Sequence, residues 1–256
     1  MSTVRTLGTV RRVKGNLVGI EIGGSKLQIV CGDGRGQIVE RFKFKVEARR
    51  GAGAIQERIE ETLLRILRTR TVAAVGVGFG GPVDWRSGRI CCSHHVAGWA
   101  GFDMVGWLQK RARALVLVDN DANVAALAEA RLGAGRGSNP VFYVTLGSGV
   151  GGGLVVDGRI YHGAIPGEAE IGHVRLNKRG ATVESRCAGW AVDRRVRVAI
   201  RRHPSGRLAQ WAQGAKGPEA KYLKRALEEG DPAAETILRE QADDLALGLS
   251  HVTHLF

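Results

Sequence analysis

Short apolar runs and helical apolar stripes alternate along the first half of the chain. The short runs predict strands, near 17–22, 26–31, 37–45, 72–81 and 114–118. The stripes and their flanking polar residues predict helices, over 54–68, 103–113 and 119–132. After a further group of strands, the chain beyond about Trp190 is predicted to be mainly helical, including 232–253. This order of elements indicates an α/β protein with mixed sheets.

Two segments of the chain, 17–35 and 141–159, align without a gap at an offset of 124 residues. LVGIEIGGSKLQIVCGDGR lies over VFYVTLGSGVGGGLVVDGR, so Gly23 falls on Gly147. Each copy predicts a strand, a turn of small residues, a second strand and an Asp-Gly reversal suited to a hairpin. The repeat therefore predicts two lobes built on one plan. The expected division is a basic lead over 1–16, an N-terminal lobe over 17–119 and a C-terminal lobe over 120–256.

Composition is that of a globular protein, with 44% hydrophobic and 25% charged residues in 256. No apolar run approaches the roughly 18–20 residues of a membrane span, and the first residues lack the apolar stretch of a signal peptide. The four cysteines have no C-x-x-C spacing, which favours reduced thiols. A cytoplasmic location without membrane contact is expected.

The net charge of +13 raises the question of a polyanionic partner. Basic residues occur as scattered short pairs, however, and aromatic residues make up only 5% of the chain. Stacking platforms for single-stranded nucleic acid are therefore not expected, and nucleic-acid binding is disfavoured. The surplus charge also suits an anionic substrate.

The two turns of the repeat offer groups that bind phosphate. Glycines let the backbone approach an anion closely, while hydroxyl and ammonium groups add donors and charge. A single glycine hairpin is often only a turn, but two copies in register favour a polyphosphate held by both. The candidate phosphate-binding residues are Gly23, Gly24, Ser25, Lys26, Thr145, Gly147, Ser148 and Gly149.

Acidic and amide side chains crowd the segment Asp119-Asn120-Asp121-Ala122-Asn123 at the start of a predicted helix. One such residue suffices as an N-cap, so the surplus favours a further role. A carboxylate here is able to take a proton from an attacking hydroxyl. The later segment PGEAEIGH also places carboxylates and an imidazole in one turn, although a solvated surface loop explains it equally well by itself.

Taken together, these motifs resemble the ROK family of bacterial sugar kinases and repressors, from about Leu17 to the last residue. The most specific stretches are GWAGFDMVGWLQKRARALVLVDNDANVAALAEARLGAG and TLGSGVGGGLVVDGRIYHGAIPGEAEIGHV. The resemblance implies an actin-like, hexokinase-type fold of two RNase H-like lobes. It implies glucokinase- or fructokinase-like activity, with ATP and magnesium as cofactors, a hexose as substrate and a homodimer as the assembly.

The resemblance also assigns residues. Asp121 falls on the catalytic base, Glu21 takes the place of the aspartate in the D-x-G-G-T-K motif and is the candidate magnesium contact, and Thr145 begins the second phosphate loop. Sugar contacts are implied at Gly81, Asn120, Asp121, Glu170, His173 and Glu184.

Three departures from the family pattern modify these expectations. The family's cysteine cluster is replaced by Asn177-Lys178-Arg179-Gly180-Ala181-Thr182-Val183, so a zinc site is not expected. Glu21 is one methylene longer than aspartate, and displacements of about 1 Å in a catalytic site can cost ~100-fold in rate. The family's final strand and glycine turn do not follow Phe256, so an incomplete C-terminal lobe and weakened activity are expected.

The leading hypothesis is ATP-dependent phosphorylation of a hexose hydroxyl with Asp121 as general base. A catalytically impaired sugar-binding protein is the alternative from another class, favoured by Glu21. A polyphosphate-dependent sugar kinase is a second alternative, favoured by the surplus positive charge. The repressor branch is disfavoured because only about 16 residues precede the first strand, too few for a helix-turn-helix.

Overall fold

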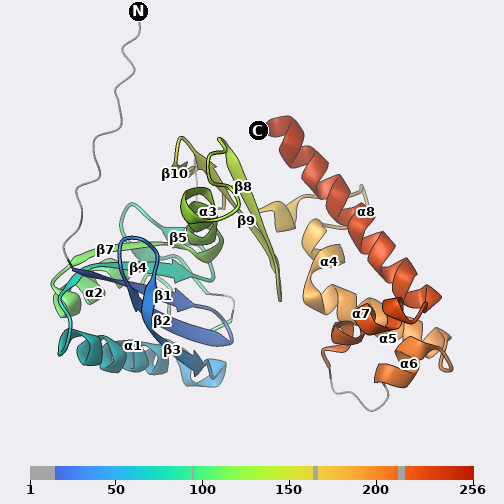
Figure 1. Ribbon diagram of the computed structural model, residues 1–256, viewed down its shortest axis with the longest axis horizontal. Helices are drawn as coiled ribbons and strands as arrows, with labels where there is room; N and C mark the ends of the chain where they lie inside the picture. Colours follow the sequence, from blue (N-terminus) through green and yellow to red (C-terminus); the bar gives the residue numbers. More distant parts are fainter. Residues whose placement is uncertain (1–14, 94, 164–166, 213–216) are drawn as a thin grey trace, which may run out of the picture. The chain divides into compact units, whose positions relative to one another are not determined.

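The chain divides between Val124 and Ala125 into two compact units (Figure 1). The computed structural model describes residues 15–93, 95–163, 167–212 and 217–256. The basic lead predicted at the start of the chain lies, up to residue 14, outside these ranges.

A five-stranded mixed sheet forms the first unit, in the order β3-β2-β1-β4-β7. Its strands are β1 (Asn16–Ile22), β2 (Lys26–Gly32), β3 (Ile38–Lys45), β4 (Val72–Phe79) and β7 (Leu115–Asn120). β1, β2 and β3 form an antiparallel meander, whereas β4 and β7 run parallel to β1. A separate two-stranded ribbon follows β4, made of β5 (Val83–Asp84) and β6 (Arg89–Ile90).

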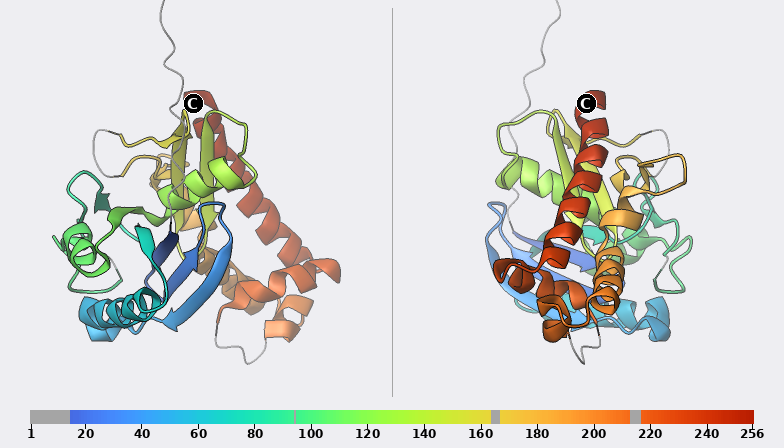
Figure 2. Two further views of the ribbon diagram at one scale, coloured as in Figure 1. Left: turned by 60° about the vertical axis from the view of Figure 1, so that its left-hand side comes forward. Right: turned by 90° about the vertical axis from the view of Figure 1, so that its right-hand side faces the viewer.

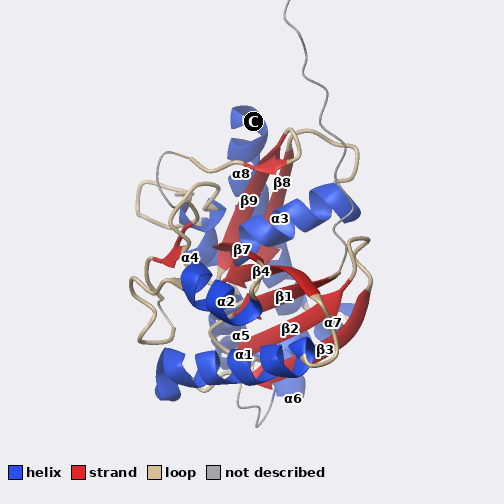
Figure 3. Cartoon of the chain, turned by 90° about the vertical axis from the view of Figure 1, so that its left-hand side faces the viewer, coloured by secondary structure: helices blue, strands red, loops and turns tan. Residues whose placement is uncertain are grey.

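Helices pack on one face of this sheet (Figure 3). They are α1 (Gly51–Leu67), which the short η1 (Ala48–Arg50) precedes, and α2 (Met104–Ala112), while α3 (Asp121–Leu132) follows β7. Apolar residues alternate along β1 and β2, and those on one side bury against the stripe of α1 that contains Ile59 and Leu63. Asp103 caps α2 by accepting a hydrogen bond from the N–H of Gly106 at 2.9 Å.

The second unit combines a three-stranded antiparallel sheet with a group of helices (Figure 2). The strands are β8 (Val141–Leu146), β9 (Val150–Val156) and β10 (Arg159–Ile160). The helices are η2 (Ile171–His173), α4 (Val183–Cys187), α5 (Gly189–Arg202), α6 (Arg207–Ala212), η3 (Glu219–Tyr222), α7 (Leu223–Glu228) and α8 (Pro232–Leu255). One apolar cluster joins α5, α6, α7 and α8, and another joins β9, η2, α4 and α8.

The α/β fold predicted from the sequence is confirmed, and so are both hairpins of the repeat. Several predicted boundaries shift by a few residues, and one of them bears on the site. β7 continues through Asn120, which pairs with Phe79, so the helix predicted from Asp119 begins at Asp121. The two Asp-Gly reversals also differ. Asp157-Gly158 forms a two-residue turn with φ of 51° and 70°, whereas the chain after Asp33 closes only at Gln37.

All four cysteines lie within the described ranges and carry free thiols, as the sequence predicted. Within those same ranges, every helix is too short or too polar to cross a membrane.

Candidate functional site

The first glycine turn, Gly23–Ser25, is held by backbone hydrogen bonds on three sides. The N–H of Gly23 donates to the carbonyl of Lys26 at 2.9 Å, and the N–H of Val46 donates to the carbonyl of Ser25 at 2.9 Å. The carbonyl of Ile22 accepts from the N–H of Gly80 at 2.8 Å, which joins this turn to the end of β4. The turn is therefore fixed in position while the side chains of Ser25 and Lys26 remain exposed.

In the polar segment at the end of β7, neighbouring residues make different hydrogen bonds and have different roles. Asn120 caps α3, because its Oδ1 accepts from the N–H groups of Ala122 at 2.9 Å and Asn123 at 3.3 Å. Its Nδ2 also donates to the carbonyl of Gly81 at 3.2 Å, which ties the predicted sugar loop to the helix start. Asp119 accepts from the side chain of Asn123 at 3.0 Å. Asp121 is thus not needed as the cap.

Asp121 lies at the junction of the β4 end and the first turn. Its Oδ1 accepts from the N–H of Ala122 at 2.9 Å, and its Oδ2 lies 3.3 Å from where a Cβ would stand on Gly80. The missing side chain of Gly80 therefore leaves room for the carboxylate. Burial raises the pKa of Asp121, the Ala122 N–H opposes that rise, and the negative charge of Glu21 adds to it.

Glu21 lies on β1, just before the first turn, and both of its carboxylate oxygens have donors. Oε1 pairs with Nζ of Lys26 at 3.0 Å, and Oε2 accepts from Nε2 of Gln28 at 3.1 Å. A magnesium ion needs open carboxylate oxygens at about 2.0–2.1 Å. The Lys26 ammonium beside Oε1 repels a cation, and a direct Glu21–magnesium bond would require that pair to open, so no step is assigned to a metal at this residue.

The second glycine turn, Gly147–Gly149, is held by backbone groups and one carboxylate. The N–H of Gly147 donates to the carbonyl of Gly149 at 2.9 Å, and the carbonyl of Gly147 accepts from the N–H of Gly189 at 2.8 Å. Oε2 of Glu184 accepts from the N–H of Val150 at 2.9 Å. Ser148 is exposed, and Thr145 lies within β8, paired with Gly151.

Glu184 therefore supports the hairpin from outside, a role that sequence reasoning missed. It lies in α4, whose start is fixed by a capping box between Thr182 and Ser185. The box predicts a helix start at this point but says nothing about which strand the glutamate reaches. The hairpin contact comes from the packing of α4 on β9 through Val150 and Val183.

The predicted sugar-contact segment packs directly on the same strand. Glu170 precedes η2, and the N–H of His173 donates to the carbonyl of Glu170 at 3.0 Å. A Cβ on Gly172 would stand 2.1 Å from the carbonyl oxygen of Val150, so only glycine fits. His173 is exposed and Glu170 half-buried. The structure thus brings Glu170, His173 and Glu184 around the start of β9, whereas Pro166 lies outside the described residues.

Hydrogen bonds close the loop that replaces the family's cysteine cluster. Oδ1 of Asn177 accepts from the N–H groups of Arg179 at 2.9 Å and Ala181 at 3.2 Å, and the N–H of Leu176 donates to the carbonyl of Ala181 at 2.7 Å. This side-chain turn fixes the loop locally.

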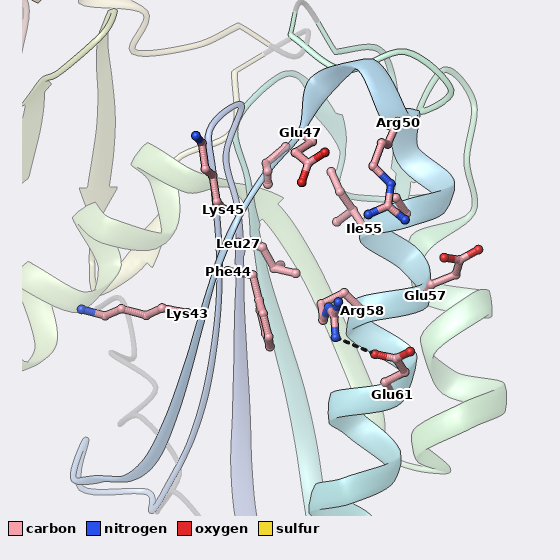
Figure 4. A pocket seen from close by; sticks show the side chains of 12 residues that line it. Leu27, Lys43, Phe44, Lys45, Glu47, Arg50, Ile55, Glu57, Arg58 and Glu61 are labelled. Atoms are coloured by element: carbon pink, nitrogen blue, oxygen red, sulfur yellow. Dashed lines mark hydrogen bonds and ion pairs between the residues drawn. The ribbon is translucent and has the colours of Figure 1, made fainter.

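Two cavities lie near the hairpins, one in each unit. A polar cavity of about 370 Å³ lies between β3 and α1, lined by Phe44, Ile55 and Arg58 among others (Figure 4). A mainly apolar cavity of about 420 Å³ borders the second turn. Its lining includes Leu146, Gly147, Gly189, Val192, Leu223 and Lys224.

Comparisons with known proteins agree on one family. The sequence profile of the ROK family matches residues 17–256. A glucokinase from Thermotoga maritima is 28% identical over 248 residues, which cover 94% of this chain and 78% of that protein. The chain is also similar to a crystal structure of a ROK family glucokinase from Streptomyces griseus in complex with glucose and AMPPNP, with a TM-score of 0.80 and 30% sequence identity. The match covers 94% of this chain and 80% of the Streptomyces chain.

A third similar protein is named for two phosphoryl donors. The inorganic polyphosphate/ATP-glucomannokinase from Arthrobacter sp. strain KM has 29% identity and a TM-score of 0.58, with 71% of each chain covered.

Proposed function

The chain belongs to the ROK family, and on that premise we propose that it transfers the γ-phosphoryl group of ATP to a hydroxyl of a hexose. The crystal structure with glucose and AMPPNP supports the choice of substrates, because it covers 94% of this chain at 30% identity. One observation carries the proposal within the chain itself. Asp121, buried enough to raise its pKa, lies beside Gly80 at the first glycine turn.

Asp121 acts as the general base in this proposal. A general base works best when its pKa lies closer to the operating pH than that of a free carboxylate. Burial and the charge of Glu21 shift the pKa of Asp121 in that direction. Asn120 fixes the helix start through three hydrogen bonds, so the carboxylate of Asp121 is held on a rigid element. The sugar hydroxyl gives its proton to Asp121 while the oxygen of that hydroxyl attacks the γ-phosphorus of ATP.

The two turns bind phosphate oxygens in the same proposal. Phosphoryl transfer requires mainly positioning and compensation of negative charge. In the first turn, the exposed Ser25 hydroxyl and Lys26 ammonium supply a donor and a positive charge. In the second, the small residues Gly147, Ser148 and Gly149 let a phosphate approach the N–H groups of Ser148 and Gly149, since that of Gly147 is bonded within the turn. Magnesium, when bound to the nucleotide, neutralises charge on the phosphates.

The cavity beside the second turn is the proposed site for the nucleoside. It borders Gly147 and is lined mainly by apolar side chains, with Lys224 at its edge. A mostly apolar cavity with few polar groups is typical of small-molecule sites, and a volume of roughly 300–1,000 Å³ is usual. Its position would let a base occupy the cavity while the phosphates reach the turn.

The sugar contacts are proposed at both predicted segments. Gly81 and Asn120 shape the loop beside Asp121, and Asn120 uses part of its amide for that purpose. Glu170 and His173 lie at η2, while Glu184 is proposed to act on the sugar indirectly by supporting β9.

A hexose panel tests the proposal against the sugar-binding alternative. With at least one aldohexose or with fructose, we expect the protein to release ADP from ATP, which a coupled assay measures. Calorimetric titration of the same sugars measures binding independently of turnover. Sugar binding without turnover by any hexose would favour an impaired, sugar-binding protein, and absence of both would overturn the proposed function.

A further inference from the structure

A row of cationic side chains covers one face of the β2–β3 ribbon. The strand register places Lys26 opposite Lys45, Gln28 opposite Lys43, and Val30 opposite Arg41. Phe42 and Phe44 alternate with these cations and pack on the core. Alternation along a strand therefore turns Arg41, Lys43 and Lys45 to the other face. Lys43 and Lys45 point away from α1 in Figure 4. We call Lys26, Arg41, Lys43 and Lys45 the cation ladder.

The ladder is poorly neutralised by the protein. Directly opposed like charges on neighbouring strands are destabilising, and Lys26 and Lys45 form such a pair. Lys26 has Glu21 as a partner at 3.0 Å. Nη1 of Arg41 donates to Oε1 of Gln28 at 3.4 Å, which is a neutral acceptor. In the described part of the chain, Lys43 and Lys45 have no acidic partner within 4 Å. A bound anion would remove the repulsion.

The ladder also begins at the first glycine turn. Lys26 is the residue that closes this turn, and Val46, next to Lys45, donates to the carbonyl of Ser25 at 2.9 Å. From Lys45 to Arg41 the strand advances about 14 Å at ~3.4 Å per residue. The positive face therefore extends well beyond the single phosphoryl group that a transfer site must hold.

We infer that the cation ladder binds inorganic polyphosphate and presents its terminal phosphoryl group at the first turn, so that polyphosphate is a second donor. This inference rests on the proposed function for the acceptor and for Asp121. In the transfer, the hydroxyl oxygen of the hexose forms a bond to the terminal phosphorus. The bond from that phosphorus to the bridging oxygen breaks, the hydroxyl proton passes to Asp121, and polyphosphate leaves one unit shorter. A linear polyanion matches a linear row of cations in charge and in extent.

The test compares two donors on the full chain. Variant Lys43→Gln/Lys45→Gln removes two ladder charges outside the turn, and Lys110→Gln/Lys178→Gln removes two exposed charges elsewhere. We expect calorimetry with long-chain polyphosphate to show binding that weakens about tenfold in the ladder variant, as exposed ionic contacts of modest strength allow. The control variant should bind as the wild type does. The specificity constant kcat/KM for ATP should change by less than about twofold in both, since the exposed Lys43 and Lys45 lie on β3, outside the first turn.

A charge-preserving variant and a second polyanion serve as further controls on polyphosphate binding. Lys43→Arg/Lys45→Arg should retain polyphosphate binding, which shows that charge and not a folding defect causes the loss. Wild-type protein that does not bind polyphosphate, or equal binding by the ladder and control variants, overturns the inference. Equally tight binding of duplex DNA of matched charge also overturns it, because the ladder would then be a general polyanion surface.

Failure of the inference is distinguishable from failure of the proposed function. If the protein turns over with ATP but does not bind polyphosphate, only the inference that polyphosphate is a second donor is overturned. No turnover with either donor overturns the proposed function, while calorimetry still decides whether the ladder binds polyphosphate.

Discussion

The two glycine hairpins share a sequence plan but differ in what surrounds their turns. The first turn has charged side chains beside it: Glu21 and Lys26 form an ion pair, Gln28 donates to Glu21, and Asp121 lies at the adjoining strand end. The second has neutral turn residues and is held by Glu184 through a backbone N–H. The repeat thus preserves the order of strand, turn and strand, whereas the carboxylates of Asp121 and Glu184 beside the two turns come from segments outside the repeat.

The hairpins also differ in register, although their sequences align without a gap. In the first, Ile22 pairs with Leu27, so four residues lie between the last paired positions. In the second, Leu146 pairs with Val150, so three residues do. A one-residue difference in register turns side chains to the opposite face of a strand. Equivalent positions in the alignment therefore need not have equivalent roles.

The largest effect on stability is expected from packing at the second hairpin. Gly172→Ala would place a Cβ 2.1 Å from the backbone oxygen of Val150, and backbone cannot move aside cheaply. We expect a loss of about 3 kcal/mol or more in the free energy of unfolding, measured by denaturant titration.

The matched substitution at the first hairpin is Gly24→Ala, where the atoms nearest to the new Cβ would be the Cβ and Cγ of His95, both at 2.7 Å. Rotation about χ1 cannot move the Cβ of His95, so the backbone at this exposed residue must shift, and we expect a loss of about 1–2 kcal/mol, smaller than that of Gly172→Ala. Equal losses in the two variants would contradict the difference in packing.

The next effect concerns the carboxylate that supports the second hairpin. Glu184→Ala leaves the N–H of Val150 without its acceptor, and we expect a loss of about 1–3 kcal/mol in the free energy of unfolding. Glu184→Gln keeps an acceptor oxygen and should lose less. If alanine and glutamine behave alike under the same titration, the hydrogen bond does not support the hairpin.

A smaller effect, which increases the free energy of unfolding, is expected at Asp121 beside the first hairpin. Burial raises the pKa of Asp121 in the fold, so the stability that its protonated form supplies is complete below the unfolded pKa and is lost as pH rises through the folded pKa. Asp121→Asn removes the buried charge and should raise the unfolding free energy at pH 7, by about 1 kcal/mol.

The gain should vanish near pH 3, where the carboxyl is protonated in both states. Thermal unfolding across this range measures it, with the exposed Asp243→Asn as the matched variant. A variant less stable than wild type at pH 7 would show that Asp121 serves the fold.

The smallest effect is expected from the ion pair beside the first turn. The side chains of Glu21 and Lys26 are 43% and 50% exposed, and exposed pairs contribute about 0–1 kcal/mol. Glu21→Gln should therefore change the unfolding free energy by less than about 1 kcal/mol. The same denaturant titration checks it, and a larger loss would assign Glu21 a structural role comparable to that of Glu184.

Sequence patterns predicted much of the fold and less of the site. Alternation in β1 and β2 and the stripe of α1 predicted the sheet and its helix, because burial of one face follows directly from spacing. Crowding of polar residues after β7 drew attention to Asp121. Patterns could not show that Asn120 is the cap, since capping depends on where the strand ends.

Contacts made across long sequence separations were beyond such reasoning. Glu184 and Val150 are 34 residues apart, and their hydrogen bond depends on how α4 packs on β9. The opposition of Lys26 and Lys45 likewise depends on strand register, which is set by how the loop closes between Asp33 and Gln37.

Single-turnover phosphorylation of the preferred hexose by Asp121→Asn tests the central claim most directly. With wild-type protein and Asp243→Asn as references, we predict that the rate of phosphoryl transfer falls about 10²–10⁴-fold, while the Kd for the sugar changes by only a few fold. A transfer rate in Asp121→Asn equal to that of the two references would contradict the role of Asp121 as general base.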